Sequence, residues 1–478
     1  MSNEAINMKM PLLRDDMPNA SAAACGLKIN FGRQRMTASD FNALVDFGRE
    51  RRILEEHRRM AAGEIVNLTE KRAALHMSLR SFSAKSPFYE DVATERARLF
   101  DFAERVRSGR WRGCRGDRIT DVINVGIGGS DMGPRAIWHA ARPPRPSINL
   151  HFLSSVDGVL LERILADCRP QSTLIVISSK SFTTREMQVN AAAVDQWLLD
   201  HGIVGTDRER HMVVVSANPH AAEIMCLPEQ NFFHIWDWVG GRFSVWGAIG
   251  LPLMIALGTE VFRELLQGAW EMDRHSLAAP IEENLPAILA LLEYWNSTRL
   301  DMASHSLLPY DERFRVMVPW LQQLEMESLG KRRRPDGSVV EGATGLAVWG
   351  ANGNEAQHSF YQWLREGTGR TSIDLVWSRL PGHRYAEHFR VLLANARAQA
   401  EVLVRRELDG PYFNAVNTIE LDAASPRRVG AMMAMYEHKT TMLGTLFGIN
   451  PFDQPGVELG KKLSRRAEAG ADLSAILD

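Results

Sequence analysis

Several hydroxyl groups surround one lysine after a short apolar run in the first half of the chain. Residues 174–177 are apolar, and residues 178–184 read Ser-Ser-Lys-Ser-Phe-Thr-Thr. A phosphate has only acceptor oxygens at neutral pH, so a helix start rich in Ser and Thr binds it well. Ordinary helix capping is the alternative, but it needs one such residue rather than five. The segment is therefore predicted to bind a phosphate.

A second candidate anion site is the glycine-rich segment 121–134. It begins with an apolar, β-branched run typical of a buried strand. Its glycines allow a tight turn that brings backbone N–H groups close to a ligand, and a helix is expected to begin near Pro134. A dinucleotide fingerprint would need glycine at Asp131, and a Walker A loop would need lysine at Pro134. A sugar phosphate remains the simplest ligand, and a tight turn without a ligand is the alternative.

Five further residues could carry proton transfer or stabilise charge. Arg242 follows a glycine pair, and it either pairs with a nearby carboxylate or stabilises an oxyanion that forms during a reaction. Glu325 and Glu327 are two residues apart, so they point to different faces of a helix and at most one is catalytic. His358, near a strand's carboxyl end, is either structural or functional. Lys461 lies on a terminal helix, where a solvated lysine is the common case.

Alternating short apolar runs and helical patterns position these residues. Each early run ends in Ser or Asn before a helical pattern begins, which indicates a parallel sheet with helices on both faces. A second set of runs follows, interleaved with helical patterns at 385–405 and 428–446. Two α/β units in tandem are therefore expected, with ligands at the carboxyl ends of the strands. The runs are 148–153, 174–177, 212–215, 304–309, 346–349, 373–377 and 418–421.

The length of 478 residues exceeds a single core and favours several parts. We expect a helical N-terminal segment that packs on the larger domain, two α/β domains and a C-terminal helical arm. Their expected bounds are 1–86, 87–257, 258–450 and 451–478.

Composition indicates a cytoplasmic protein. The net charge is −2, which gives no reason to expect nucleic acid or an anionic membrane as a partner, and the basic run 331–334 is predicted to be an exposed turn. No apolar stretch is long enough for a membrane span, and no signal peptide is indicated. The four cysteines form no C-x-x-C pair, which argues against zinc and disulfides and suits a reducing compartment. They are Cys25, Cys114, Cys168 and Cys226.

Six segments, in order, resemble the signatures of the phosphoglucose isomerase family. They are the glycine-rich segment, the phosphate loop, the arginine signature, the glutamate helix, the Gln-His segment and the C-terminal Asp-Gln-x-Gly-Val-Glu signature. The resemblance implies two sugar-isomerase-type domains, each with a mainly parallel sheet flanked by helices. It also implies interconversion of glucose 6-phosphate and fructose 6-phosphate without a cofactor or metal. The segments are 126–134, 179–184, 239–251, 321–331, 357–362 and 452–461.

The resemblance also assigns catalytic roles. Glu327, rather than Glu325, would move a proton between C1 and C2 through a cis-enediolate, and Arg242 would stabilise that intermediate. His358 and Lys461 would open and close the sugar ring, and Glu186 would orient the histidine. In this family the histidine comes from the neighbouring subunit, so a homodimer is implied. The implied phosphate contacts are Ser179, Lys180, Ser181 and Thr184, and the implied sugar contacts are Gly129, Ser130 and Gln323.

Three departures from the family pattern bear on substrate tolerance. Residues 353–356 read Gly-Asn-Glu-Ala where the family usually has Gly-Thr-Asn-Gly, which introduces a carboxylate near His358. Met187 stands where threonine is common, and Pro455 replaces an aromatic residue. One alternative is an enzyme that also accepts mannose 6-phosphate. Another is a non-catalytic sugar-phosphate-binding regulator, which would have no need of Glu327, Arg242 and Lys461.

Overall fold

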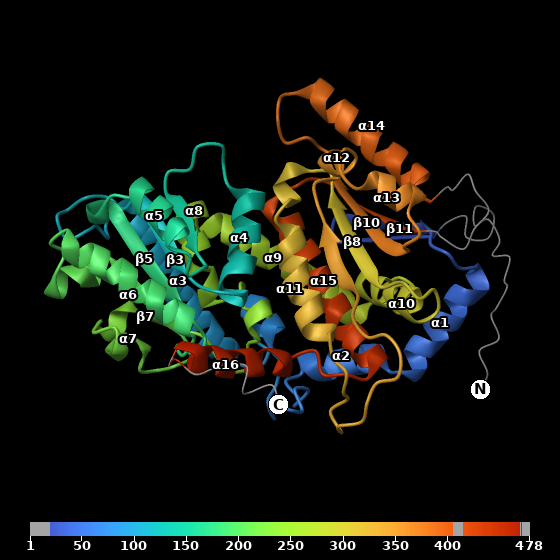
Figure 1. The fold of residues 1–478 in the computed structure, drawn as a ribbon, viewed down its shortest axis with the longest axis horizontal. Helices are drawn as coiled ribbons and strands as arrows, with labels where there is room; N and C mark the ends of the chain where they lie inside the picture. The colour runs from blue at the N-terminus through green and yellow to red at the C-terminus, as the bar shows by residue number, and fades with distance from the viewer. Residues whose placement is uncertain (1–19, 405–413, 469, 471–478) are drawn as a thin grey trace.

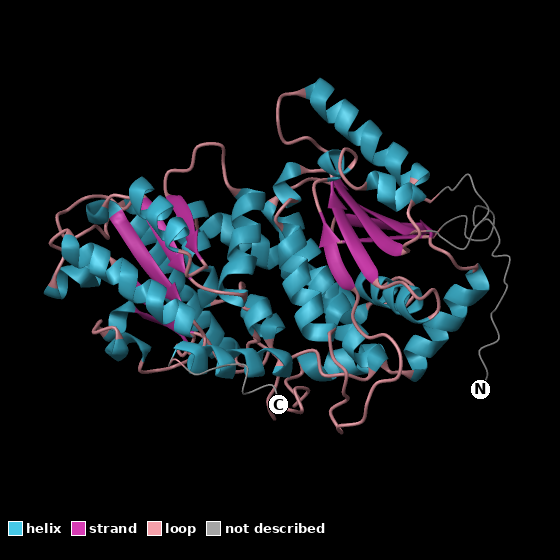
Figure 2. Ribbon diagram, in the orientation of Figure 1, coloured by secondary structure: helices cyan, strands magenta, loops and turns pink. Residues whose placement is uncertain are grey.

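Two β-sheets lie side by side, with helices between them and around them (Figure 1). The computed structural model describes residues 20–404, 414–468 and 470. Helices cover the faces of both sheets, as the colouring by secondary structure makes plain (Figure 2). The expected α/β class with mainly parallel sheets is therefore confirmed.

The first sheet has five parallel strands in the order β4-β3-β5-β6-β7. Three of them, β3, β5 and β6, are buried along their whole length, as expected for strands covered on both faces. The last strand, β7, was not expected from the sequence. The strands are β3 (Asp121–Val125), β4 (Asn149–Leu153), β5 (Thr173–Ser178), β6 (Met212–Ser216) and β7 (Phe232–His234). The helices that follow them are α4 (Gly129–Ala141), α5 (Gly158–Asp167), α6 (Arg185–Asp200) and α7 (Ala221–Ile224).

Helix α4 begins at Gly129, five residues before the predicted start near Pro134. Proline has no N–H, so the carbonyl of Ser130 loses its usual helical donor. The side chain of Asn124, on β3, donates to that carbonyl at 3.0 Å instead. This replacement lets the helix run through Pro134 and brings its first turn directly onto the glycine-rich loop.

The second sheet has six strands in the order β1-β2-β11-β10-β8-β9. Its last four strands are parallel, whereas β2 pairs antiparallel with β11. The N-terminal segment, which was expected to be helical, also contributes the hairpin β1–β2, and this hairpin completes the sheet. In β2 the side chains of Leu27, Ile29 and Phe31 are buried at alternating positions. The strands are β1 (Ser21–Ala24), β2 (Leu27–Arg33), β8 (Ser304–Pro309), β9 (Ala347–Gly350), β10 (Thr371–Ser378) and β11 (Ala415–Leu421).

Helix α15 (Pro426–Phe447) forms the centre of the helical layer between the sheets, and most of its residues are buried. It contacts α9, α10 and α11, which Figure 1 shows grouped around it. The predicted helices at 385–405 and 428–446 are present as α14 and α15, although Arg405 lies outside the described residues. The other helices are α1 (Ala38–Glu50), α2 (Ile53–Ala61), α3 (Tyr89–Ser108), α8 (Leu251–Leu257), α9 (Thr259–Ala278), α10 (Leu285–Thr298), α11 (Met317–Leu329), α12 (Gly353–Ala356), α13 (Tyr361–Glu366), α14 (Ala386–Val402) and α16 (Glu458–Glu468).

Among the described residues, no helix is both long and apolar enough to cross a membrane. The division of the chain into parts at residues 86, 257 and 450 stays a prediction.

Candidate active site

The glycine-rich loop meets the arginine segment and the glutamate helix between the two sheets. Helix α4 contacts both α11 and the short 3-10 helix η5 (Gly241–Phe243). A Cβ atom on Gly129 would lie 2.1 Å from the backbone of Gly241, so only glycine allows this approach. Gly128 has φ of 59°, and a Cβ there would lie 3.1 Å from the amide nitrogen of Gln323. The loop therefore forms one wall of a site completed by the second half of the chain.

The guanidinium of Arg242 is held by partners from two distant segments. Its Nε donates to the hydroxyl of Ser328 at 2.6 Å, and its Nη1 donates to Gln454 Oε1 at 3.0 Å. Its Nη2 donates to the carbonyls of Pro451 at 2.5 Å and Asp453 at 3.1 Å. Burial lowers the pKa of Arg242, and nearby carboxylates partly oppose that shift. The group is thus a fixed, largely desolvated cation.

The carboxylate of Glu327 lies against this cation. Its Oε1 is 3.6 Å from Arg242 Nη1, and its Oε2 accepts a hydrogen bond from Gln323 at 3.1 Å. The Glu327 side chain is 26% exposed, so a ligand in the site can reach it. A carboxylate base beside an immobilised cation can remove a proton from a carbon acid while the cation stabilises the oxyanion that forms.

Glu325 faces the opposite way, as the two-residue spacing predicts. It is buried and accepts a hydrogen bond from Lys439 on α15 at 2.7 Å. Burial, together with the neighbouring Glu293, raises the pKa of Glu325 to about 7. This carboxylate anchors α11 to α15, and that leaves Glu327 as the carboxylate of α11 that faces the site.

Lys331 was expected in an exposed basic turn, and that prediction was wrong for this residue. Its ammonium donates to the carbonyls of Glu327 at 2.9 Å and Ser328 at 2.8 Å, and it lies 3.4 Å from Asp453. Burial, followed by the charge of Arg242, lowers the pKa of Lys331 to about 8. The sequence position of Lys331, directly after the glutamate helix, could have predicted these contacts, because a cation at a helix C-terminus meets unpaired carbonyls.

The predicted phosphate loop connects β5 to α6. It turns at Phe182, which has φ of 57° and a buried ring, and the N–H of Phe182 donates to Ser179 Oγ at 3.1 Å. Ser181 is exposed, and its hydroxyl accepts from Thr183. Thr184 precedes α6 and makes no side-chain capping bond to the helix. The loop thus presents hydroxyls at the positive end of a helix.

Lys180 links this loop to the arginine segment. Its ammonium donates to the carbonyls of Asp237 at 2.7 Å and Val239 at 2.8 Å. Burial, followed by repulsion from Arg72, lowers the pKa of Lys180 to about 8. Lys180 therefore ties the predicted phosphate loop to the backbone that leads into Arg242.

Lys461 lies on α16, which passes below the first unit (Figure 1). The side chain of Lys461 is 55% exposed and pairs with Glu458, one turn earlier, at 2.8 Å. The end of α16 is tied to the start of α6, because Glu468 forms an ion pair with Arg185 at 2.9 Å. This helix therefore reaches the phosphate loop from the far end of the chain.

The side chains of His358 and Glu186 are both exposed. His358 is exposed in the turn between α12 and α13. Figure 1 shows α12 well away from α16, which carries Lys461. Within the described residues, no hydrogen bond or ion pair joins the His358 side chain to Glu327, Arg242 or Lys461. Glu186 is exposed in the first turn of α6.

The three departures from the family pattern have plain structural settings. Glu355 forms an ion pair with Arg315 through both carboxylate oxygens, so its charge is matched before it can act on His358. Met187 is buried in the core of the first unit, where a hydrophobic side chain fits. Pro455 begins a short 3-10 helix, as its fixed φ favours.

Comparisons with known proteins agree along most of the chain. A sequence model of the family described as phosphoglucose isomerase matches residues 30–409 and 413–476. A glucose-6-phosphate isomerase of Burkholderia orbicola (strain MC0-3) is 43% identical over 470 residues, which cover 94% of this chain and 87% of the relative. A glucose-6-phosphate isomerase of Paraburkholderia xenovorans (strain LB400) is 41% identical, with 95% and 87% covered.

Comparison with solved structures also finds a glucose-6-phosphate isomerase. The crystal structure of a glucose-6-phosphate isomerase from Chlamydia trachomatis D/UW-3/Cx superposes with a TM-score of 0.84 at 28% identity. The superposition covers 95% of this chain and 90% of the other. A hypothetical protein from Thermus thermophilus superposes with a TM-score of 0.72 at 30% identity, covering 93% of this chain and all of the other.

Proposed function

The chain belongs to the phosphoglucose isomerase family, which interconverts glucose 6-phosphate and fructose 6-phosphate in glycolysis and gluconeogenesis, and from this premise we propose the residues that carry the reaction. Glu327 takes the proton from C2 of the open-chain aldose and returns it to C1. The hydroxyl proton at O2 passes to O1, so the product is the ketose. Arg242 stabilises the negative charge of the cis-enediolate between these steps.

One observation carries this assignment. The Glu327 carboxylate lies 3.6 Å from a guanidinium that two other segments already hold in place. A fixed cation needs little reorganisation when charge develops on the substrate, and that is the main source of electrostatic catalysis.

The remaining contacts hold the substrate. The phosphate is held by the loop before α6, where hydroxyls, a lysine and a helix N-terminus converge. Gln323, bonded to the catalytic carboxylate at 3.1 Å, contacts the sugar together with the first turn of α4. The proposed phosphate ligands are Ser179, Lys180, Ser181 and Thr184, and the proposed sugar contacts are Gly129, Ser130 and Gln323.

Ring opening needs a second subunit in this proposal. Lys461 and His358 transfer protons at the ring oxygen and the anomeric hydroxyl, and Glu186 orients the imidazole. Helix α12 and helix α16 lie far apart within one chain, which is the separation expected when His358 serves the neighbouring site. The active species is therefore a homodimer, and we place it in the cytoplasm with the glycolytic pathway.

The first experiment measures conversion of fructose 6-phosphate to glucose 6-phosphate by the purified chain, with EDTA present. Rapid turnover that EDTA does not slow is expected. Formation of mannose 6-phosphate is followed in parallel, and its absence would assign the chain a strict preference for the glucose epimer. Tight binding of the sugar phosphate without turnover would contradict the proposal.

The second experiment mixes two inactive variants, Glu327→Gln and His358→Ala, under conditions that let subunits exchange. If His358 serves the neighbouring subunit, each heterodimer contains one intact site. Random exchange then restores roughly a quarter of wild-type activity, as the symmetry of a two-fold dimer requires. No recovery, with exchange verified by mass spectrometry, would show that His358 acts within its own chain.

A further inference from the structure

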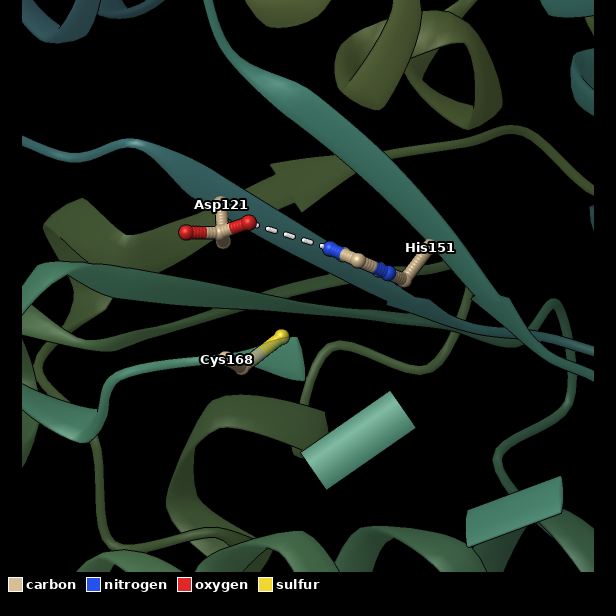
Figure 3. A group of neighbouring side chains, drawn as sticks. All are labelled: Asp121, His151 and Cys168. Atoms are coloured by element: carbon tan, nitrogen blue, oxygen red, sulfur yellow. Dashed lines mark hydrogen bonds and ion pairs between the residues drawn. The ribbon is translucent and has the colours of Figure 1, made fainter. Parts of the chain in front are cut away.

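Three potential metal ligands of different chemistry converge at the amino end of the first sheet (Figure 3). Asp121 is the first residue of β3, His151 lies in the middle of β4, and Cys168 follows the end of α5. One ligand atom from each lies within 4.8 Å of the other two. Figure 3 shows the sulfur of Cys168 and the ring of His151 both facing the Asp121 carboxylate.

This cluster is separate from the candidate active site. The glycine-rich loop and the phosphate loop follow the carboxyl ends of β3 and β5, whereas Asp121 stands at the amino end of β3. In a parallel sheet the amino ends of the strands lie on one side and the carboxyl ends on the opposite side, so the two sites are separated by the length of the strands. The cluster therefore has no part in the isomerisation chemistry.

The ligand atoms of Asp121 and His151 are nearly at the spacing of a zinc site. Asp121 Oδ1 and His151 Nε2 are 3.1 Å apart. Nitrogen and oxygen ligands about 2.0–2.1 Å from a tetrahedral zinc ion lie about 3.3 Å from each other. Cys168 directly follows α5, and its sulfur lies within 4.8 Å of the ligand atoms of both other residues. Nitrogen, sulfur and carboxylate oxygen together are the ligands that zinc prefers.

The charge balance also favours a cation. The side chain of Asp121 is 8% exposed, and His151 is its only ion-pair partner among the described residues. The carboxylate of Asp121 also accepts hydrogen bonds from the side chains of Asn149 and Thr120.

We propose that Asp121, His151 and Cys168 bind one divalent transition-metal ion, zinc by their chemistry, with water as the fourth ligand. The ion takes the place of the proton shared by Asp121 and His151, and of the thiol proton of Cys168, so binding releases protons. It links β4, β3 and the segment that enters β5. The lack of a C-x-x-C pair had argued against zinc, but this cluster uses a single cysteine together with ligands from two other segments.

Cobalt(II) tests the site because a cobalt–thiolate bond absorbs in the near ultraviolet. The full chain is treated with chelator, dialysed and titrated with cobalt(II), and then with zinc(II) as competitor. One equivalent of cobalt, a thiolate charge-transfer band and its loss on addition of zinc are expected. Proton release measured in a weak buffer should accompany binding. The absence of a stoichiometric band would overturn the proposal.

Two variants and one control identify the ligands. Cys168→Ser should abolish the charge-transfer band, and His151→Gln, at a partly exposed position on an edge strand, should weaken zinc binding at least tenfold. Cys226→Ser removes an exposed cysteine outside the cluster and should bind as the wild type does. Zinc should raise the melting temperature of the wild type and the control, but not of Cys168→Ser. An equal band in Cys168→Ser would assign the metal to another cysteine and overturn the proposed ligand set.

Discussion

The candidate active site has two halves that are built in different ways. Around Arg242 and Glu327, the groups are held by contacts within one chain: every guanidinium nitrogen has a partner, and Gln323 fixes the carboxylate. The side chains of His358 and Lys461 are exposed, and Lys461 pairs with a glutamate one turn away on the same helix.

This difference matches the difference in chemistry. Proton transfer through an enediolate needs a cation fixed before charge develops, because reorganisation during the reaction would cost free energy. Ring opening moves protons between oxygens, so the side chains that carry it can be brought together by the bound substrate or by a second subunit. We therefore expect substitutions in the fixed half to lower kcat, and substitutions in the open half to depend on pH, substrate or assembly.

The largest effect is expected in the fixed half. Glu327→Gln should lower kcat by roughly 10²–10⁴-fold with little change in substrate binding, since general base catalysis contributes about that much. Steady-state kinetics and isothermal calorimetry with fructose 6-phosphate measure the two quantities. Glu325→Gln is the matched control: it should lower the free energy of unfolding by about 1.5–3 kcal/mol through the lost bond to Lys439, with kcat changed less than about tenfold. A large loss of kcat in Glu325→Gln, with kcat nearly unchanged in Glu327→Gln, would make Glu325 the catalytic base instead.

Arg242→Ala comes next. Loss of a fixed cation at the oxyanion should lower kcat by roughly 10²–10³-fold, or about 2.7–4 kcal/mol of transition-state stabilisation. Ser328→Ala removes one partner of Arg242 but keeps its charge, so a loss of about tenfold or less is expected. Circular dichroism of both variants controls for folding. A change confined to KM would make Arg242 a binding residue instead.

The next smaller effect is expected at Lys180, which links the phosphate loop to the segment that leads into Arg242. Burial and Arg72 lower its pKa to about 8, so its positive charge is present below pH 8 and is lost as pH rises through 8. At pH 9 about one tenth of the charge remains, and kcat/KM should fall by up to about tenfold between pH 7 and 9. Lys180→Arg keeps its charge over this range and should flatten the profile. Parallel profiles for both proteins would assign the titration to another group.

The smallest effect is expected at Glu355, in the open half. Its carboxylate is paired with Arg315 through both oxygens at an exposed position, where ion pairs contribute little. Glu355→Asn, which restores the residue usual at this position of the family segment, should change kcat/KM for fructose 6-phosphate by less than about twofold. A larger change, or new formation of mannose 6-phosphate, would make this segment a determinant of specificity.

Much of the fold could be predicted from hydrophobic runs. The strand expected at 304–309 coincides with β8, and the runs at 174–177 and 212–215 lie within β5 and β6. These strands are buried on both faces, which gives a continuous apolar signal. Strand β2 was missed although it alternates buried and exposed residues, because its pattern is short and lies among charged residues. Strand β7, at three residues, is too short for either pattern.

The candidate site was predictable in its residue types but not in its contacts. Two-residue spacing separated Glu325 from Glu327, and the structure places them on opposite sides of α11 as that spacing requires. By contrast, Arg242 is held by Pro451 and Asp453, about 210 residues later in the chain. No local pattern carries such a pairing, and the burial of Lys331 follows from the same long-range packing.

The antiparallel pairing of β2 with β11 also has a consequence for synthesis of the protein. Leu27 pairs with Leu421, so β2, near the start of the chain, must wait for β11, near its end. At roughly 5–20 residues per second, the ribosome delivers that partner roughly 20–80 s later. The first sheet, contained within residues 121–234, can form during this interval. The nascent hairpin β1–β2, with its apolar face uncovered, is then a natural target for chaperones until translation ends.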